Sequence, residues 1–204
     1  MKKLGSWLRT VPTLVIIGTV LCLVLAVGGG LLLWGSHFAD HIVHTQLSEQ
    51  KITFPPKGSP ALDPAEFPGL QRYAGQSVDN GPKAKAYADQ FIRKHLQGVA
   101  NGQTYSEVSG QVVAATSAGK TPDPKLVQAQ DTLFRGETLR GLLLNVWGWA
   151  TMGEIAFWVG IAALIGAFAV LCALVLAFVM HVRQESAEAA GKPSVPADRE
   201  LVTL

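Results

Sequence analysis

The chain has 204 residues, of which 49% are hydrophobic and 16% are charged, with a formal net charge of +2. Soluble domains are about 25% charged, so this deficit indicates a membrane protein. The small net charge and the lack of a basic cluster argue against a nucleic-acid partner. The two cysteines, Cys22 and Cys172, both lie in apolar stretches, which argues against a disulfide-stapled secreted module.

Two stretches, residues 13–34 and 155–180, contain no Asp, Glu, Lys or Arg. A hydrocarbon core about 30 Å thick needs roughly 20 apolar helical residues, and both stretches exceed that length. We therefore predict two transmembrane helices. The first could instead be a cleaved signal peptide behind Lys2, Lys3 and Arg9. Its apolar run is longer than a usual signal core of about 7 to 15 residues, and no small-x-small cleavage site follows.

Charge sets the expected orientation of the two spans. Residues 1–12 are basic and carry no acid, which favours their retention in the cytoplasm. With two spans, residues 181–204 return to the cytoplasm as a tail. The sequence thus predicts an all-α protein of the cell membrane, a two-helix transmembrane hairpin whose residues 35–154 form a small helical extracytoplasmic domain.

The extracytoplasmic segment should contain helices on both sides of an irregular, surface-hugging section. Residues 35–50 extend the first span as an amphipathic helix, and repeated prolines and glycines make residues 55–82 a proline-rich strap. The pattern then favours a helix between Pro82 and Gly98. Thr104–Glu107 fits a capping box that opens another helix.

The last predicted helix covers about residues 125–189, with glycines at Gly148 and Gly153 as candidate kinks, and it becomes the second span. We see no convincing strand. The expected core is thin and draws on apolar residues of the outer segment: Phe54, Phe67, Leu70, Tyr73, Tyr87, Phe91, Leu96, Tyr105, Leu133 and Phe134. A core of this kind favours a stabilising partner.

Three histidines on one predicted helical face form the most suggestive candidate site. His37, His41 and His44 are four and three residues apart, so they share a face, and Asp40 lies beside them. Imidazole binds zinc, copper or iron, and a carboxylate can join or orient it. A single metal shared by all three is difficult, because the outer two are about 10 Å apart. The alternatives are a proton-responsive contact or an ordinary polar helix at the headgroup level.

A second candidate set lies just before the second span. Glu154 sits near Trp147 and Trp149, and tryptophans at this level are typical of the interfacial belt. A carboxylate here reaches water, or, if it lies deeper, marks a salt bridge to a partner.

Arg135 and Arg140 flank Glu137 on the same predicted helix. Either arginine could pair with Glu137 or bind an anionic lipid headgroup, although exposed charges of this kind usually form a solvated face.

Small residues recur at helical spacing in both spans, and such faces let membrane helices approach closely. They are Gly18, Cys22, Ala26 and Gly30 in the first span and Ala162, Gly166, Ala169, Ala173 and Ala177 in the second. Antiparallel spans would also place the two cysteines at similar depth. Neither span has an ionisable residue at its centre, which argues against transport by this chain alone.

Four runs resemble an actinobacterial family of two-span membrane proteins without an established function. The runs are Lys51–Pro56, Lys83–Asp89, Thr104–Ser109 and Thr132–Leu144, and the likeness covers roughly residues 13–180. Members are often labelled aromatic ring-opening dioxygenases. The sequence does not support that label, because such enzymes are soluble and need two histidines and a carboxylate around iron. The resemblance implies a Gram-positive-type envelope and a cell-membrane location.

No hydrolase, phosphate-loop or zinc-protease motif is present, so we predict no catalytic residue and no cofactor. The leading hypothesis is a membrane accessory subunit or scaffold whose outer domain docks on a membrane-protein partner or on a second copy. A metal- or haem-linked oxidoreductase component, using a transition metal at the histidine face, is the first alternative. A lipid- or ligand-binding envelope sensor is the second.

Overall fold

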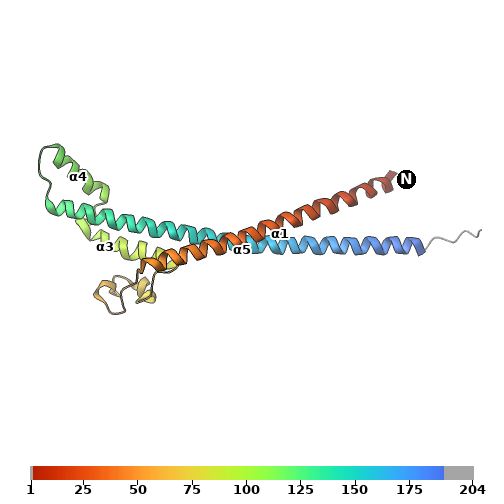
Figure 1. Cartoon of the computed structure of the whole chain (residues 1–204), viewed down its shortest axis with the longest axis horizontal. Helices are drawn as coiled ribbons and strands as arrows, with labels where there is room; N and C mark the ends of the chain where they lie inside the picture. Colours follow the sequence, from red (N-terminus) through yellow and green to blue (C-terminus); the bar gives the residue numbers. More distant parts are fainter. Residues whose placement is uncertain (1, 191–204) are drawn as a thin grey trace, which may run out of the picture. The chain divides into compact units, whose positions relative to one another are not determined.

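The computed structural model describes residues 2–190, and side chains over residues 13–186 (Figure 1). Within the described chain, all regular structure is helical, apart from an isolated antiparallel bridge between Thr53 and Ser77. The predicted cytoplasmic tail is described only as far as Ala190. The all-helical class predicted from the sequence is therefore confirmed for this part of the chain.

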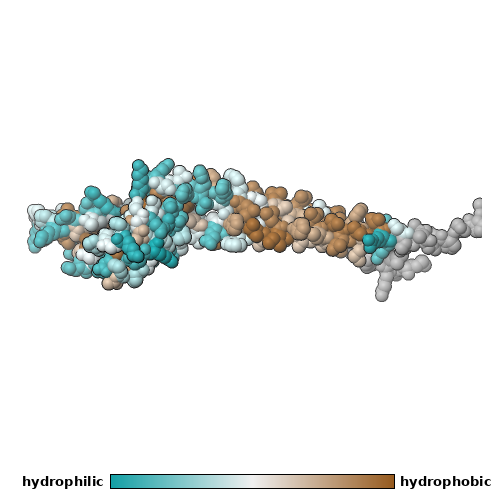
Figure 2. All heavy atoms as spheres, turned by 90° about the horizontal axis from the view of Figure 1, so that it is seen from below, coloured by the Kyte–Doolittle hydropathy of each residue, from teal (hydrophilic) through white to brown (hydrophobic). Residues whose placement is uncertain are grey.

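Two helices are much longer than the rest, α1 (Lys2–Gln50) and α5 (Pro124–Ala190). Both are long and apolar enough to cross a membrane, by length and composition. Figure 2 shows their apolar stretches as a brown surface, in contrast to the largely teal and white surface of the intervening residues. The predicted extension of the first span to Gln50 is confirmed, and α5 runs without interruption through Gly148 and Gly153.

The chain divides into two compact units. The described part of unit 1 comprises residues 2–31 of α1 and residues 159–190 of α5. Unit 2 is Leu32–Trp158. Each unit has its own packing.

In unit 1 the two helices meet at small residues and run antiparallel. A Cβ added to Gly29 would lie 3.0 Å from the carbonyl oxygen of Gly160 and 3.0 Å from the Leu164 side chain. Further along, the Cys22 thiol lies 3.4 Å from the Ala167 carbonyl oxygen as a weak donor. The backbones therefore approach closely, as expected for membrane helices that pack through glycine and alanine.

The predicted small faces are only partly correct. On α1, Gly18 and Cys22 face α5 as predicted. Gly30 does not, because a Cβ added there would meet no atom within 4 Å, and Gly29 makes the contact instead. On α5, Gly160 and Ala167 are buried, whereas four residues of the predicted face are exposed: Ala162, Ala169, Ala173 and Ala177. The small residues of α5 occur on more than one face, so spacing alone did not identify the packed one.

Cys172 is exposed and Cys22 packs against Ala167, so the two cysteines do not face each other.

Unit 2 has one apolar core, built from every segment of the unit. Val43 and Leu47 enter it from the last turns of α1, and Leu133 and Leu143 enter it from α5. The proline-rich strap contains two short 3-10 turns, η1 (Pro60–Leu62) and η2 (Pro68–Tyr73). It is irregular, as predicted, but it is more than a surface segment, because it buries four apolar side chains: Leu62, Phe67, Leu70 and Val78.

The helix predicted between Pro82 and Gly98 forms as three continuous pieces. They are α2 (Gly81–Ala86), a π-helical turn η3 (Tyr87–Ile92) and α3 (Arg93–Gln97). A π-turn adds a residue to the local helical repeat and so shifts the buried face. Ala84 and Ala86 are buried before this turn, and Ala88 and Ile92 are buried within it.

A short 3-10 turn, η4 (Val99–Gly102), leads to α4 (Tyr105–Ser117), which opens with the predicted capping box. The Thr104 hydroxyl accepts a hydrogen bond from the Glu107 amide at 3.3 Å, and the Thr104 amide donates to the Glu107 carboxylate at 2.7 Å. Hydrogen bonds from the Thr104 backbone and side chain stabilise the ionised carboxylate and lower the pKa of Glu107.

The predicted core is largely correct, with one clear error. Phe134 is 54% exposed, whereas its neighbour Leu133 is 2% exposed and belongs to the core. Adjacent helical residues point about 100° apart, and in this turn Leu133 faces the core while Phe134 points away from it. Phe134 instead contacts the ring of Tyr105, with ring centroids 5.5 Å apart.

Replacing Gly29 with leucine should weaken the pairing of α1 with α5. We expect a loss of about 1–3 kcal/mol of unfolding free energy, because the new side chain overpacks a closed contact. Gly30→Leu is the matched control, since an added Cβ there meets nothing within 4 Å. Thermal unfolding of each full-length variant in detergent measures its stability relative to the unmodified chain. Equal losses in the two variants would contradict the contact.

Candidate functional site

Unit 2 contains a cavity of about 550 Å³ between the last part of α1, the start of α2 and α5. Its lining comprises Leu33, Ser36, His37, Asp40, Asn80, Gly81, Pro82, Trp147, Ala150, Thr151, Gly153, Glu154 and Phe157. The cavity thus brings together residues from both sets predicted from the sequence. His37, Trp147 and Glu154 lie around one space, although they come from opposite ends of the unit.

Two glycines allow the surrounding segments to come this close. A Cβ at Gly81 would collide with the Cβ of Ala150 on α5, so the start of α2 can lie against α5 only without a side chain there. A Cβ at Gly153 would lie 3.2 Å from the Ala39 Cβ on α1. The walls of the cavity are therefore positioned by two tight contacts of α5, one with the start of α2 and one with α1.

The polar lining residues differ in how they are bonded. Asn80 caps α2 by accepting from the Lys83 amide at 3.0 Å, and the Thr151 hydroxyl donates to the Trp147 carbonyl at 2.9 Å. Within the described part of the chain, His37, Asp40 and Glu154 have no hydrogen-bond or ion-pair partner. These three ionisable side chains are thus free to interact with a ligand, as is the Ser36 hydroxyl.

The apolar lining includes two aromatic rings. The Lys85 ammonium nitrogen lies 3.8 Å from the centre of the Trp147 ring, a close cation–π contact. Phe157 also lines the cavity and is 42% exposed. The cavity therefore combines two carboxylates with aromatic and aliphatic walls.

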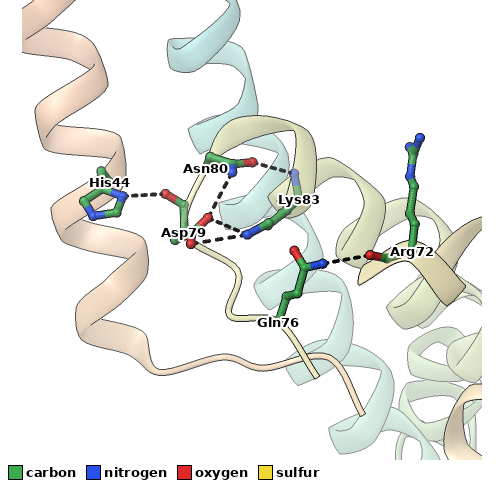
Figure 3. A network of polar contacts seen from close by, with 6 residues as sticks. All are labelled: His44, Arg72, Gln76, Asp79, Asn80 and Lys83. Atoms are coloured by element: carbon green, nitrogen blue, oxygen red, sulfur yellow. Dashed lines mark hydrogen bonds and ion pairs between the residues drawn. The ribbon is translucent and has the colours of Figure 1, made fainter. Parts of the chain in front are cut away.

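The three histidines of the predicted metal face have different surroundings. His37 lines the cavity, His41 is exposed, and His44 Nδ1 lies 3.0 Å from the backbone carbonyl oxygen of Asp79 (Figure 3). The described residues include no group of three or more His, Cys, Asp or Glu side chains placed to hold a metal ion. The transition-metal site stays a prediction.

Figure 3 also shows how the end of the strap is held beside α1. The Asp79 carboxylate accepts from Lys83 Nζ at 3.0 Å and from Asn80 Nδ2 at 2.9 Å. Nearby, Gln76 Nε2 donates to the Arg72 carbonyl at 2.8 Å. His44 therefore takes part in a structural network that fixes the approach to α2.

The two predicted arginines differ in their pairing. Arg140 lies 3.1 Å from Asp89 and 3.2 Å from Glu137, while Arg135 pairs with Asp131 at 3.0 Å rather than with Glu137. Desolvation lowers the pKa of Arg140, but its hydrogen bonds to the two carboxylates outweigh this effect and the pKa is raised. Sequence reasoning missed Asp89, because no local pattern connects it with α5.

One face of α5 in unit 2 exposes several large apolar side chains, with Asp131, Thr138 and Asn145 between them. We define the α5 stripe by its apolar members: Val127, Phe134, Leu142, Trp149 and Met152. Leu142, Trp149 and Met152 are 59%, 62% and 63% exposed. Trp149, one of the predicted contact residues, belongs to this stripe, whereas Trp147 lines the cavity.

No protein-family model, curated protein or solved structure matches the chain. The resemblance to a two-span membrane family stays a prediction.

Arg140→Ala should destabilise unit 2 far more than Arg135→Ala. Arg140 and Asp89 are 26% and 29% exposed, so removing the arginine leaves a partly buried carboxylate unpaired, at a cost of about 1–3 kcal/mol. Arg135 is 78% exposed, and its loss should change stability by less than about 0.5 kcal/mol. Denaturant unfolding followed by circular dichroism makes the comparison. Similar losses for the two variants would show that the Asp89 contact contributes little.

Proposed function

We propose that the chain is a non-enzymatic membrane accessory subunit or scaffold. Its two apolar helices form a transmembrane hairpin, and residues 35–154 form an extracytoplasmic domain that docks on a partner in the same membrane. The bilayer is the first partner in this proposal, and a membrane protein is the second.

The α5 stripe is the observation that carries the proposal. Residues 141–153 contain no Asp, Glu, Lys or Arg, yet residues 155–180 alone are long enough to cross a bilayer of about 30 Å. The lack of charge in residues 141–153 therefore needs an explanation other than membrane spanning. Leu143 covers the core from one face of these turns, while Leu142 and Trp149, on either side of it, are exposed.

An exposed apolar surface of this kind is typical of a protein interaction site. Trp149 is a strong candidate anchor, because tryptophan is enriched among residues that dominate binding energy. The stripe lies on the same helix as the apolar stretch over 155–180, immediately before it in sequence. A partner that covers the stripe would thus be expected at the membrane surface, which favours a membrane protein over a soluble one.

The alternative of a metal-linked oxidoreductase has weaker support. Its proposed ligands would be His37, His41 and His44, but the described residues include no group of three or more His, Cys, Asp or Glu side chains placed to hold a metal ion. The alternative of a ligand-binding sensor is favoured by the cavity, and it is compatible with a docking role because the two use different faces of α5.

Substitution of Trp149 with glutamate should release the partner. The tagged full chain is purified from its native membrane in mild detergent, and a photoreactive amino acid at position 149 is used to cross-link whatever covers the stripe. We expect one discrete membrane protein, whose recovery falls by about tenfold or more in Trp149→Glu, because a charge would be buried at the contact.

Gln128→Glu is the matched control, an exposed position on the same helix, and it should leave recovery unchanged. Cross-links to a second copy alone would replace the accessory role with self-association. A monomeric chain without cross-links at position 149 would contradict docking altogether.

A further inference from the structure

We propose that the cavity of unit 2 binds an organic cation, a primary amine or quaternary ammonium group carried on an apolar body. This inference is independent of docking at the α5 stripe. It rests on the charge of the cavity, on its aromatic walls and on its size.

The charge of the lining selects a cation. Asp40 and Glu154 line the cavity, and none of the lining residues is lysine or arginine. The two nearby lysines do not line the cavity: Lys83 bonds the Asp79 carboxylate at 3.0 Å, and Lys85 covers one face of the Trp147 ring. Asp40 and Glu154 are both exposed, and two carboxylates of one sign around one concave, open space attract the opposite charge.

The aromatic lining selects an organic cation over a hydrated ion. Ammonium groups are attracted to the faces of Trp and Phe rings, and quaternary ammonium ligands are commonly held this way. The chain already shows this chemistry at the same residue, since the Lys85 ammonium lies 3.8 Å from the Trp147 ring centre. Phe157 offers a second ring, and Leu33 offers an aliphatic wall.

The size of the cavity fits a small molecule with an apolar part. Its volume of about 550 Å³ lies within the range of roughly 300–1,000 Å³ typical of ligand sites. An anion would be repelled by the two carboxylates. A metal ion lacks a three-ligand group among the described residues and would leave the aromatic walls unused.

Two kinds of molecule could supply the cationic group, a phospholipid headgroup or a free amine. Leu33 and Phe157 belong to the apolar stretches of α1 and α5, so a phospholipid with an amine or choline headgroup could place its chain along them. A free amine from outside the cell has the same recognition group. The experiment therefore compares both.

Benzyltrimethylammonium is titrated into the full chain in a non-ionic detergent and binding is measured by calorimetry. We expect saturable binding that weakens by about tenfold in Asp40→Asn and in Glu154→Gln, because each variant removes one carboxylate charge. Glu49→Gln is the matched control, an exposed acid on α1 that does not line the cavity. It should bind as the unmodified chain does. So should Trp149→Glu, which separates this site from the docking surface.

Added short-chain phosphatidylcholine or phosphatidylethanolamine identifies the source. Competition by these lipids assigns the site to a lipid headgroup, and binding without competition assigns it to a free amine. Absence of saturable binding by the folded chain, verified by circular dichroism, would overturn the proposal. So would equal binding by the Asp40→Asn/Glu154→Gln double variant, or a preference for phosphatidylglycerol or Zn²⁺.

Discussion

In both units, glycines lie at tight contacts between a long helix and its neighbour. Gly29 lies against Gly160 in unit 1, and in unit 2 Gly153 lies against Ala39 and Gly81 against Ala150. A glycine at such a position lets two backbones approach closely, because it has no side chain to separate them. In unit 2 the same glycines also position the walls of the cavity. Packing and candidate function therefore depend on the same backbone contacts.

Helix α5 serves three purposes in unit 2, each on a different face. One face buries Leu133 and Leu143 in the core, a second lines the cavity with Trp147 and Glu154, and a third is the exposed α5 stripe. The stripe face carries exposed polar residues such as Asn145, as in an ordinary amphipathic helix, but it also exposes large apolar side chains such as Leu142 and Trp149. The partner-docking proposal follows from this departure, and the cation site follows from the pairing of carboxylates with aromatic rings on the second face.

Sequence patterns predicted local features well and contacts between distant segments poorly. The apolar stretches, the Thr104 capping box and the helix between Pro82 and Gly98 depend on neighbouring residues, and all three were recognised. The partnership of Arg140 with Asp89 depends on a contact between distant segments, which no local pattern encodes. Phe134 was misplaced because composition predicts a core residue but not the direction in which it points. The cavity joined two predicted sets, the histidine face and the residues around Glu154, only once the helices were placed.

Membrane topology is the most direct test of the account, because docking requires residues 35–154 to lie outside the cell. The chain's two cysteines are replaced by alanine, and single cysteines are introduced as Ser117→Cys and Ser186→Cys. Intact cells are treated with a membrane-impermeant maleimide. We predict that the cysteine at 117 is labelled at once and that the cysteine at 186 is labelled only after permeabilisation. Labelling of both in intact cells, or labelling of 186 alone, would contradict the proposed hairpin.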